Sequence, residues 1–128
     1  MSAAVLRRVI DHAPIRDSTY LVLLILAHES DTCGASGPTI ATIAGRSRLS
    51  ERQTQRVLRK LESKGQLFVV RCRRDFGRGN GIGQGYAYYV TSGLNRDQML
   101  DTLRTHPLLK HVKHSPERDV AKIVERQL

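Results

Sequence analysis

Hydrophobic residues recur at helical spacing in six segments of the chain. In residues 3–12 they stand one, three and four positions apart, and Pro14 ends the pattern. The same spacing predicts five more helices, over residues 17–30, 40–44, 50–64, 95–106 and 115–128. No internal repeat is visible.

The second of these segments is apolar on nearly every side. The residues from Tyr20 to Ala27 are all hydrophobic, so we expect this helix to lie at the centre of the fold. Either Asp17 or Ser18 can cap its first turn. The run is far shorter than the roughly 18 residues of a membrane span, and the N-terminus lacks the pattern of a signal peptide.

Residues 50–64 carry the clearest local signals for a helix. Ser50 and Gln53 have the spacing of a capping box, in which each side chain accepts a hydrogen bond from the other residue's backbone amide. Gly65 suits the left-handed backbone that often ends a helix. One stripe of this helix is predicted to pack inward: Thr54, Val57, Leu58 and Leu61. The other side is basic and exposed in this prediction, with Arg52, Arg56 and Arg59 on it and Gln53, Gln55 and Lys60 at its flanks.

Two runs rich in β-branched and aromatic residues follow, over residues 67–72 and 86–90. The connection between them is rich in Gly and Arg. We therefore expect a β hairpin with a long tip. The loop over residues 31–37 has room for a further short strand before Pro38.

The positive charge is concentrated in one part of the chain. Between Arg46 and Arg78 there are eleven Lys and Arg against three Asp and Glu, a balance of +8 out of the +9 of the whole chain. Elsewhere ten basic residues stand against nine acidic ones. Such a local concentration is typical of a surface that binds phosphate.

Length and composition favour one folded unit. A chain of 128 residues that is 40% hydrophobic can bury a core without metal or disulfide help, and with six aromatic residues and no Trp that core must be aliphatic. Cys33 and Cys72 form no paired ligand motif, so free thiols are favoured over a disulfide.

Three segments together resemble the winged helix-turn-helix superfamily: Pro38–Ala44, Leu49–Leu58 and Leu61–Leu67. They are similar to small bacterial and phage DNA-binding proteins, including domains of replication initiators and mobile elements and the DNA-binding half of GntR-type regulators. The resemblance implies a mainly α fold with a small β hairpin, a three-helix core plus a wing. It covers residues 17–92, with an N-terminal extension helix in 1–16 and a C-terminal helical extension in 93–128. Where such motifs usually have Gly in the turn, this chain has Arg48, which costs on the order of 1 kcal/mol if its backbone is left-handed.

The resemblance also implies a DNA-binding site. The helix over residues 50–64 would enter the major groove, where Arg pairs with guanine and Gln with adenine through two hydrogen bonds each. The wing, over residues 71–85, would grip the adjacent backbone or the minor groove. The expected DNA-binding residues are Arg46, Arg48, Ser50, Arg52, Gln53, Gln55, Arg56, Arg59, Lys60, Arg71, Arg73, Arg74 and Arg78.

Other chemistry is disfavoured. The Gly-rich residues 76–85 lack the Gly-Lys-Ser/Thr of a phosphate loop and lead into a strand rather than a helix. His111-x-x-His114 could hold a metal, but no third ligand is apparent, so a linker or a further phosphate contact is favoured. No nucleophile, base and orienting group stand in a recognisable arrangement. We therefore expect no enzyme, no cofactor and no metal.

The expected function is that of a transcriptional regulator that binds double-stranded DNA in the cytoplasm, associated with the nucleoid. The first alternative is a replication or mobile-element accessory factor that recruits partner proteins, with Val120, Ile123 and Val124 as the contact stripe. The second is a winged-helix interaction module that does not bind DNA. The apolar stripes of the N- and C-terminal helices fit a homodimer interface and fit equally the core of their own domain.

Overall fold

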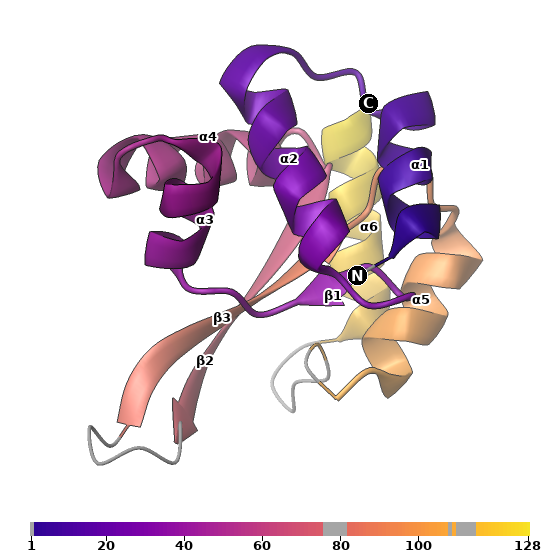
Figure 1. Ribbon diagram of the computed structural model, residues 1–128. Helices are drawn as coiled ribbons and strands as arrows, with labels where there is room; N and C mark the ends of the chain where they lie inside the picture. Colours follow the sequence, from indigo (N-terminus) through magenta and orange to yellow (C-terminus); the bar gives the residue numbers. More distant parts are fainter. Residues whose placement is uncertain (1, 76–81, 108, 110–114) are drawn as a thin grey trace.

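The computed structural model describes residues 2–75, 82–107, 109 and 115–128, and of residues 71–75 and 82–85 only the backbone is described. Within these residues the protein is mainly helical, with a small three-stranded antiparallel sheet of order β1-β3-β2. The elements, shown in Figure 1, are α1 (Ala3–His12), α2 (Asp17–Glu29), β1 (Ala35–Ser36), α3 (Ile40–Ser47), α4 (Glu51–Ser63), β2 (Leu67–Asp75), β3 (Ile82–Val90), α5 (Arg96–Thr105) and α6 (Pro116–Gln127). The expected fold class, mainly α with a small hairpin, is thereby confirmed at this coarse level.

The sheet is buried on both faces near its base. Along β2 and β3, successive side chains point to opposite faces, and they enter two different clusters of buried residues. Leu67, Tyr88 and Val90 belong to the first core, which is shared with α1–α4. Phe68 and Tyr89 belong to the second core, which is shared with α5 and α6. In Figure 1 the base of the sheet accordingly lies between α3 and α4 on one side and α5 and α6 on the other.

The flanking helices fill the cores of their own chain. Val5 and Val9 of α1 are fully buried in the first core, and Val120 and Ile123 of α6 are buried in the second. Arg8 fastens α1 to the end of the hairpin, because its guanidinium donates hydrogen bonds of 2.7 and 2.8 Å to the carbonyl oxygens of Ser92 and Val90. Burial lowers the pKa of Arg8.

The strands are longer than the sequence predicts. β2 and β3 stay in register from Leu67 opposite Val90 to Asp75 opposite Ile82, and so take up most of the segment expected as a loose tip. The cause is that a strand ladder is made by backbone groups, so glycines disfavoured by propensity still pair when the partner strand is in place. Figure 1 shows the far end of the hairpin extending away from the helices.

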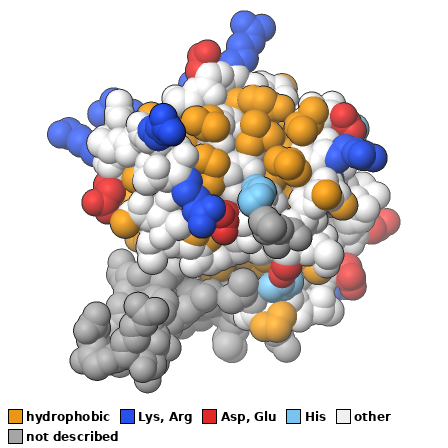
Figure 2. All heavy atoms as spheres, in the orientation of Figure 1, with side chains coloured by type: hydrophobic (Ala, Val, Ile, Leu, Met, Phe, Trp, Pro, Cys, Tyr) orange, Lys and Arg blue, Asp and Glu red, His pale blue; other side chains and the backbone are white. Residues whose placement is uncertain are grey.

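One expectation for α2 is wrong. Neither Asp17 nor Ser18 caps the helix, since its N-cap is Arg16 and no side chain caps it by a hydrogen bond. The expected central position is confirmed, because α2 contacts α1, α3, α4 and β3, although Leu21 on its outer side is 42% exposed. Figure 2 shows hydrophobic side chains gathered over α1 and α2, and Ile10 of α1 is 58% exposed.

Helix α3 extends further than expected, to Ser47 instead of Ala44. The buried Ser47 hydroxyl donates a 2.7 Å hydrogen bond to the carbonyl oxygen of Ile43, so a polar side chain is satisfied within the last turn. No helix within the described residues combines the length and the apolar character needed to cross a membrane.

Two glycines provide a matched test of this packing. Gly65 has φ +70°, and a Cβ there would lie 2.6 Å from Gln127 Cγ and 2.7 Å from the Ile123 carbonyl oxygen. Gly65→Ala should therefore lower the free energy of unfolding by more than about 1 kcal/mol. Gly45 lies in α3 with nothing within 4 Å of a Cβ, so Gly45→Ala should raise that free energy by about 0.5–1 kcal/mol. Urea unfolding measures both, and equal stability of the two variants would contradict the packing of α6 on Gly65.

Candidate functional site

Helix α4 exposes a basic face. Its buried side consists of Thr54, Leu58 and Leu61, which fix the rotation of the helix about its own axis. The opposite side points to solvent and carries Arg52, Arg56, Arg59 and Lys60, all of them exposed. Within the described part of the chain, no hydrogen bond or ion pair engages the side chain of Arg52 or Arg56. The sequence-based prediction of a packed face and a basic face is confirmed.

The first turn of α4 is held by the predicted capping box. Ser50 Oγ accepts a 3.1 Å hydrogen bond from the Gln53 amide, and Gln53 Oε1 accepts a 3.0 Å hydrogen bond from the Ser50 amide. Because Gln53 Oε1 is engaged, Gln53 cannot offer both of its amide atoms to an adenine without breaking the box. Of the two glutamines singled out in the sequence, Gln53 is therefore a cap in this conformation.

The turn before α4 is built on Arg48. This exposed residue has φ 59° and ψ 36°, which is the left-handed conformation, and it forms the C-cap of α3. Its backbone amide and that of Leu49 both bond the Ala44 carbonyl oxygen. Arg48, which stands where such turns usually have Gly, therefore adopts the left-handed conformation. A side chain at such a position lowers the stability of the fold by on the order of 1 kcal/mol.

The far end of α4 is held by α6. Gln127 Nε2 donates a 2.8 Å hydrogen bond to the Gly65 carbonyl oxygen, and Arg126 Nη1 donates a 3.4 Å hydrogen bond to that of Glu62. The expected left-handed glycine at this helix end is confirmed, with Gly65 at φ +70° after the C-cap Lys64. Both ends of α4 are therefore fixed, one locally and one by a distant segment.

A groove separates α4 from the hairpin. It encloses about 140 Å³ and is lined by Gln55 and Arg59 of α4, Ile40 of α3, and Tyr86 and Tyr88 of β3, among others. The rings of Tyr86 and Tyr88 lie 6.3 Å apart. Gln55 and Arg59 thus lie along the edge of α4 that is nearest the hairpin.

The other expected site residues are dispersed. Arg46 Nη1 lies 2.6 Å from Glu29 Oε1, so its charge is partly balanced by a neighbour. Arg71, Arg73 and Arg74 lie in β2 opposite Tyr86, Gln84 and Gly83, and their side chains are outside the description. Arg78 is outside the described residues, as are His111 and His114.

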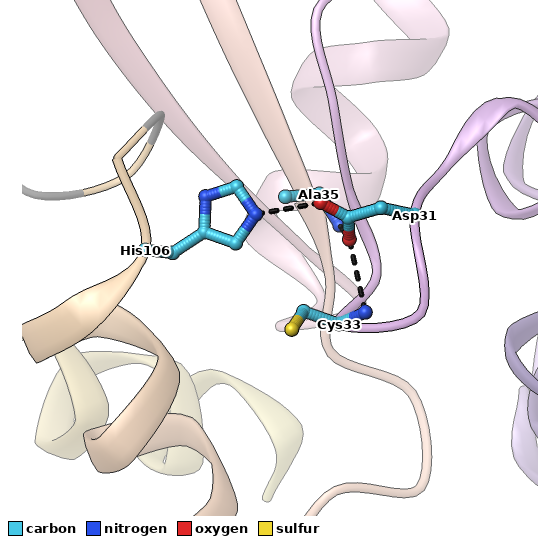
Figure 3. A network of polar contacts seen from close by, with 4 residues as sticks. All are labelled: Asp31, Cys33, Ala35 and His106. Carbon is cyan, nitrogen blue, oxygen red and sulfur yellow. Dashed lines mark hydrogen bonds and ion pairs between the residues drawn. The ribbon is translucent and has the colours of Figure 1, made fainter.

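A second group of polar side chains was missed in the sequence. Asp31, Cys33 and His106 place one ligand atom each within 4.8 Å of one another. Figure 3 shows Asp31 and Cys33 on the loop after α2, with His106 reaching Asp31 from the end of α5. The short spacing of Asp31 and Cys33 is visible in the sequence, but no sequence signal links them to a histidine 75 positions after Asp31.

Hydrogen bonds orient the Asp31 carboxylate. Its Oδ1 accepts from the amides of Cys33 (2.9 Å) and Ala35 (3.1 Å), and its Oδ2 lies 2.6 Å from His106 Nε2. Partial burial opposes ionisation of this carboxyl group, but these hydrogen bonds outweigh burial and lower its pKa. The His106 side chain is only 12% exposed. Cys33 is exposed and forms no disulfide.

Comparison with protein-family models, with curated proteins and with solved structures finds no match to this chain.

The strained turn predicts the effect of one substitution. Arg48→Gly should raise the free energy of unfolding by about 0.5–1 kcal/mol, because Gly removes the left-handed strain and loses part of that gain to the greater freedom of the unfolded chain. Arg48→Ala keeps a Cβ and should give no such gain. Urea unfolding of both variants measures the difference, and equal stabilisation by Ala and Gly would show that removal of the charge, not of the strain, is responsible.

Proposed function

We propose that this protein binds double-stranded DNA as a winged helix-turn-helix protein and acts as a sequence-specific transcriptional regulator. In this proposal α3 and α4 form the helix-turn-helix, α4 enters the major groove, and the β2–β3 hairpin is the wing. The observation that carries the proposal is the solvent-facing row of Arg52, Arg56 and Arg59 on a helix that is fixed at both ends.

The dimensions and chemistry of α4 support this proposal. An α-helix with its side chains is about 10–12 Å wide, close to the roughly 12 Å width of the major groove. Base edges are contacted from the N-terminal part of such a helix, where Arg52 and Arg56 lie. Their guanidinium groups are without protein partners in the described residues, so binding DNA would not require breaking an ion pair with any of those residues.

We propose separate roles for the basic and polar residues of α4. We assign base reading to Arg52 and Arg56. Arg59 and Lys60, further along α4, are proposed phosphate contacts. Gln53 and Ser50 bond each other in the capping box, and we propose that both serve to hold the start of the helix.

The hairpin supports a second contact. It extends beyond the helical part of the molecule (Figure 1), and β2 carries Arg71, Arg73 and Arg74 in its outer half. A basic ribbon that projects beside a groove-binding helix suits contact with the adjacent phosphates or minor groove. The groove lined by Tyr86 and Arg59 lies between the hairpin and α4.

An accessory factor for replication or for a mobile element is the second candidate. The observation in its favour is the apolar surface over α1 and α2, with Ile10 and Leu21 exposed (Figure 2). Val120 and Ile123 of α6 are buried in the chain's own second core, so a recruited protein would contact α1 and α2 in preference to α6. A winged-helix module without DNA binding is the third candidate.

Electrophoretic mobility shift over a salt series tests DNA binding. Genomic fragments selected by the wild-type protein serve as specific sites. Arg52→Ala and Arg56→Ala should each reduce discrimination between a selected site and random duplex by about 1–3 kcal/mol, because each removes a bidentate base contact. Arg73→Ala should weaken binding to all duplexes alike.

Arg118→Ala is the control, because Arg118 is an exposed arginine on α6, away from the proposed surface. It removes the same charge and should leave discrimination unchanged. In the wild type, the logarithm of the binding constant should fall with the logarithm of salt concentration by about 0.9 per phosphate neutralised. A flat salt response would favour the interaction module, and wild-type discrimination in both helix variants would refute Arg52 and Arg56 as base readers.

A further inference from the structure

The group formed by Asp31, Cys33 and His106 joins two distant parts of the fold. Asp31 and Cys33 belong to the loop between α2 and β1, and His106 is the C-cap of α5. Their ligand atoms, one carboxylate oxygen, one thiol sulfur and one imidazole nitrogen, all lie within 4.8 Å of one another. DNA binding as proposed above uses none of these three residues.

We propose that these three side chains form a Zn²⁺ site. The ligands would be Asp31 Oδ2, Cys33 Sγ and His106 Nε2, as arranged in Figure 3. Sulfur, imidazole nitrogen and carboxylate oxygen are the three donor types that proteins use for Zn²⁺. A softer metal would favour more sulfur, and Mg²⁺ or Ca²⁺ would favour oxygen alone.

The site needs only a small adjustment to accept the ion. At Zn–N and Zn–O distances of about 2.1 Å, two ligands of a tetrahedral ion lie about 3.4 Å apart. Asp31 Oδ2 and His106 Nε2 are 2.6 Å apart, so they would separate by somewhat less than 1 Å. The exposed Cys33 side chain is free of any disulfide and can follow.

The support around the ligands also fits a metal. The amides of Cys33 and Ala35 both donate to Asp31 Oδ1, which leaves Oδ2 directed at His106. Hydrogen bonds of this kind, from groups that do not touch the ion, commonly orient ligating carboxylates. Three protein ligands leave the fourth tetrahedral position to water.

A bound ion would link the segments that pack on the two faces of the sheet. The loop of residues 31–33 leads from α2, in the first core, into β1. His106 ends α5, which packs in the second core through Met99 and Leu103. An ion that binds the folded chain and not the unfolded one raises stability, so Zn²⁺ should hold the C-terminal helices against the sheet.

Zinc titration of the metal-free 128-residue chain against a competing chromophoric chelator tests the site. The wild type should bind one Zn²⁺ per chain. Cys33→Ala should weaken this binding at least about tenfold, since even residues around the ligands are commonly worth that much. Zn²⁺ should raise the melting temperature of the wild type, EDTA should reverse the rise, and the rise should be smaller in Cys33→Ala at the same Zn²⁺ concentration.

Cys72→Ala is the matched control, because Cys33 and Cys72 are the two cysteines of the chain. With Co²⁺ in place of Zn²⁺, the wild type and Cys72→Ala should show the near-ultraviolet thiolate-to-cobalt band, and Cys33→Ala should lack it. His106→Gln should weaken binding as Cys33→Ala does. Loss of the band in Cys72→Ala instead would overturn the proposal. So would a zinc affinity that is unchanged in Cys33→Ala and is lost when His111 and His114 are replaced. These outcomes do not depend on whether the protein binds DNA.

Discussion

The rest of the structure depends on the base of the β2–β3 hairpin, which is buried on both faces. Alternate residues enter different cores: Leu67 and Tyr88 pack with α1–α4, whereas Phe68 and Tyr89 pack with α5 and α6. A slip of one residue in the register would exchange these two sets and place each in the core shaped for the other. The register is therefore fixed from two sides, and every helix is positioned relative to it.

The packing of helix α4 against this sheet sets the orientation of the helix. It passes into β2 through Gly65, whose carbonyl oxygen is bound by α6. Its inward residues Leu58 and Leu61 pack in the first core with Leu67. The arginines on the opposite side of the helix therefore face solvent. A basic face held in this way presents its charges without further ordering of the backbone, which would lower the entropy cost of the proposed binding to DNA.

The C-terminal helices α5 and α6 cover the face of the sheet that α1–α4 leave open. By covering the second face of the sheet, α5 and α6 use the apolar stripes that could otherwise have bound a partner, and Val120 and Ile123 lie in the chain's own core. Apolar surface remains instead over α1 and α2. The same packing brings the end of α5 to the loop after α2, so that His106 lies beside Asp31.

The sequence by itself determined the features that depend on neighbouring residues. The limits of α1, the Ser50–Gln53 capping box, the left-handed Gly65 and the basic face of α4 follow from helical spacing and local hydrogen bonding. Tertiary structure alone decided the ion pair of Arg46 with Glu29, the length of the hairpin strands and the meeting of Asp31 with His106. These contacts join residues far apart along the chain, and only the packing of α1–α4 and α5–α6 on opposite faces of one sheet sets the distances between them.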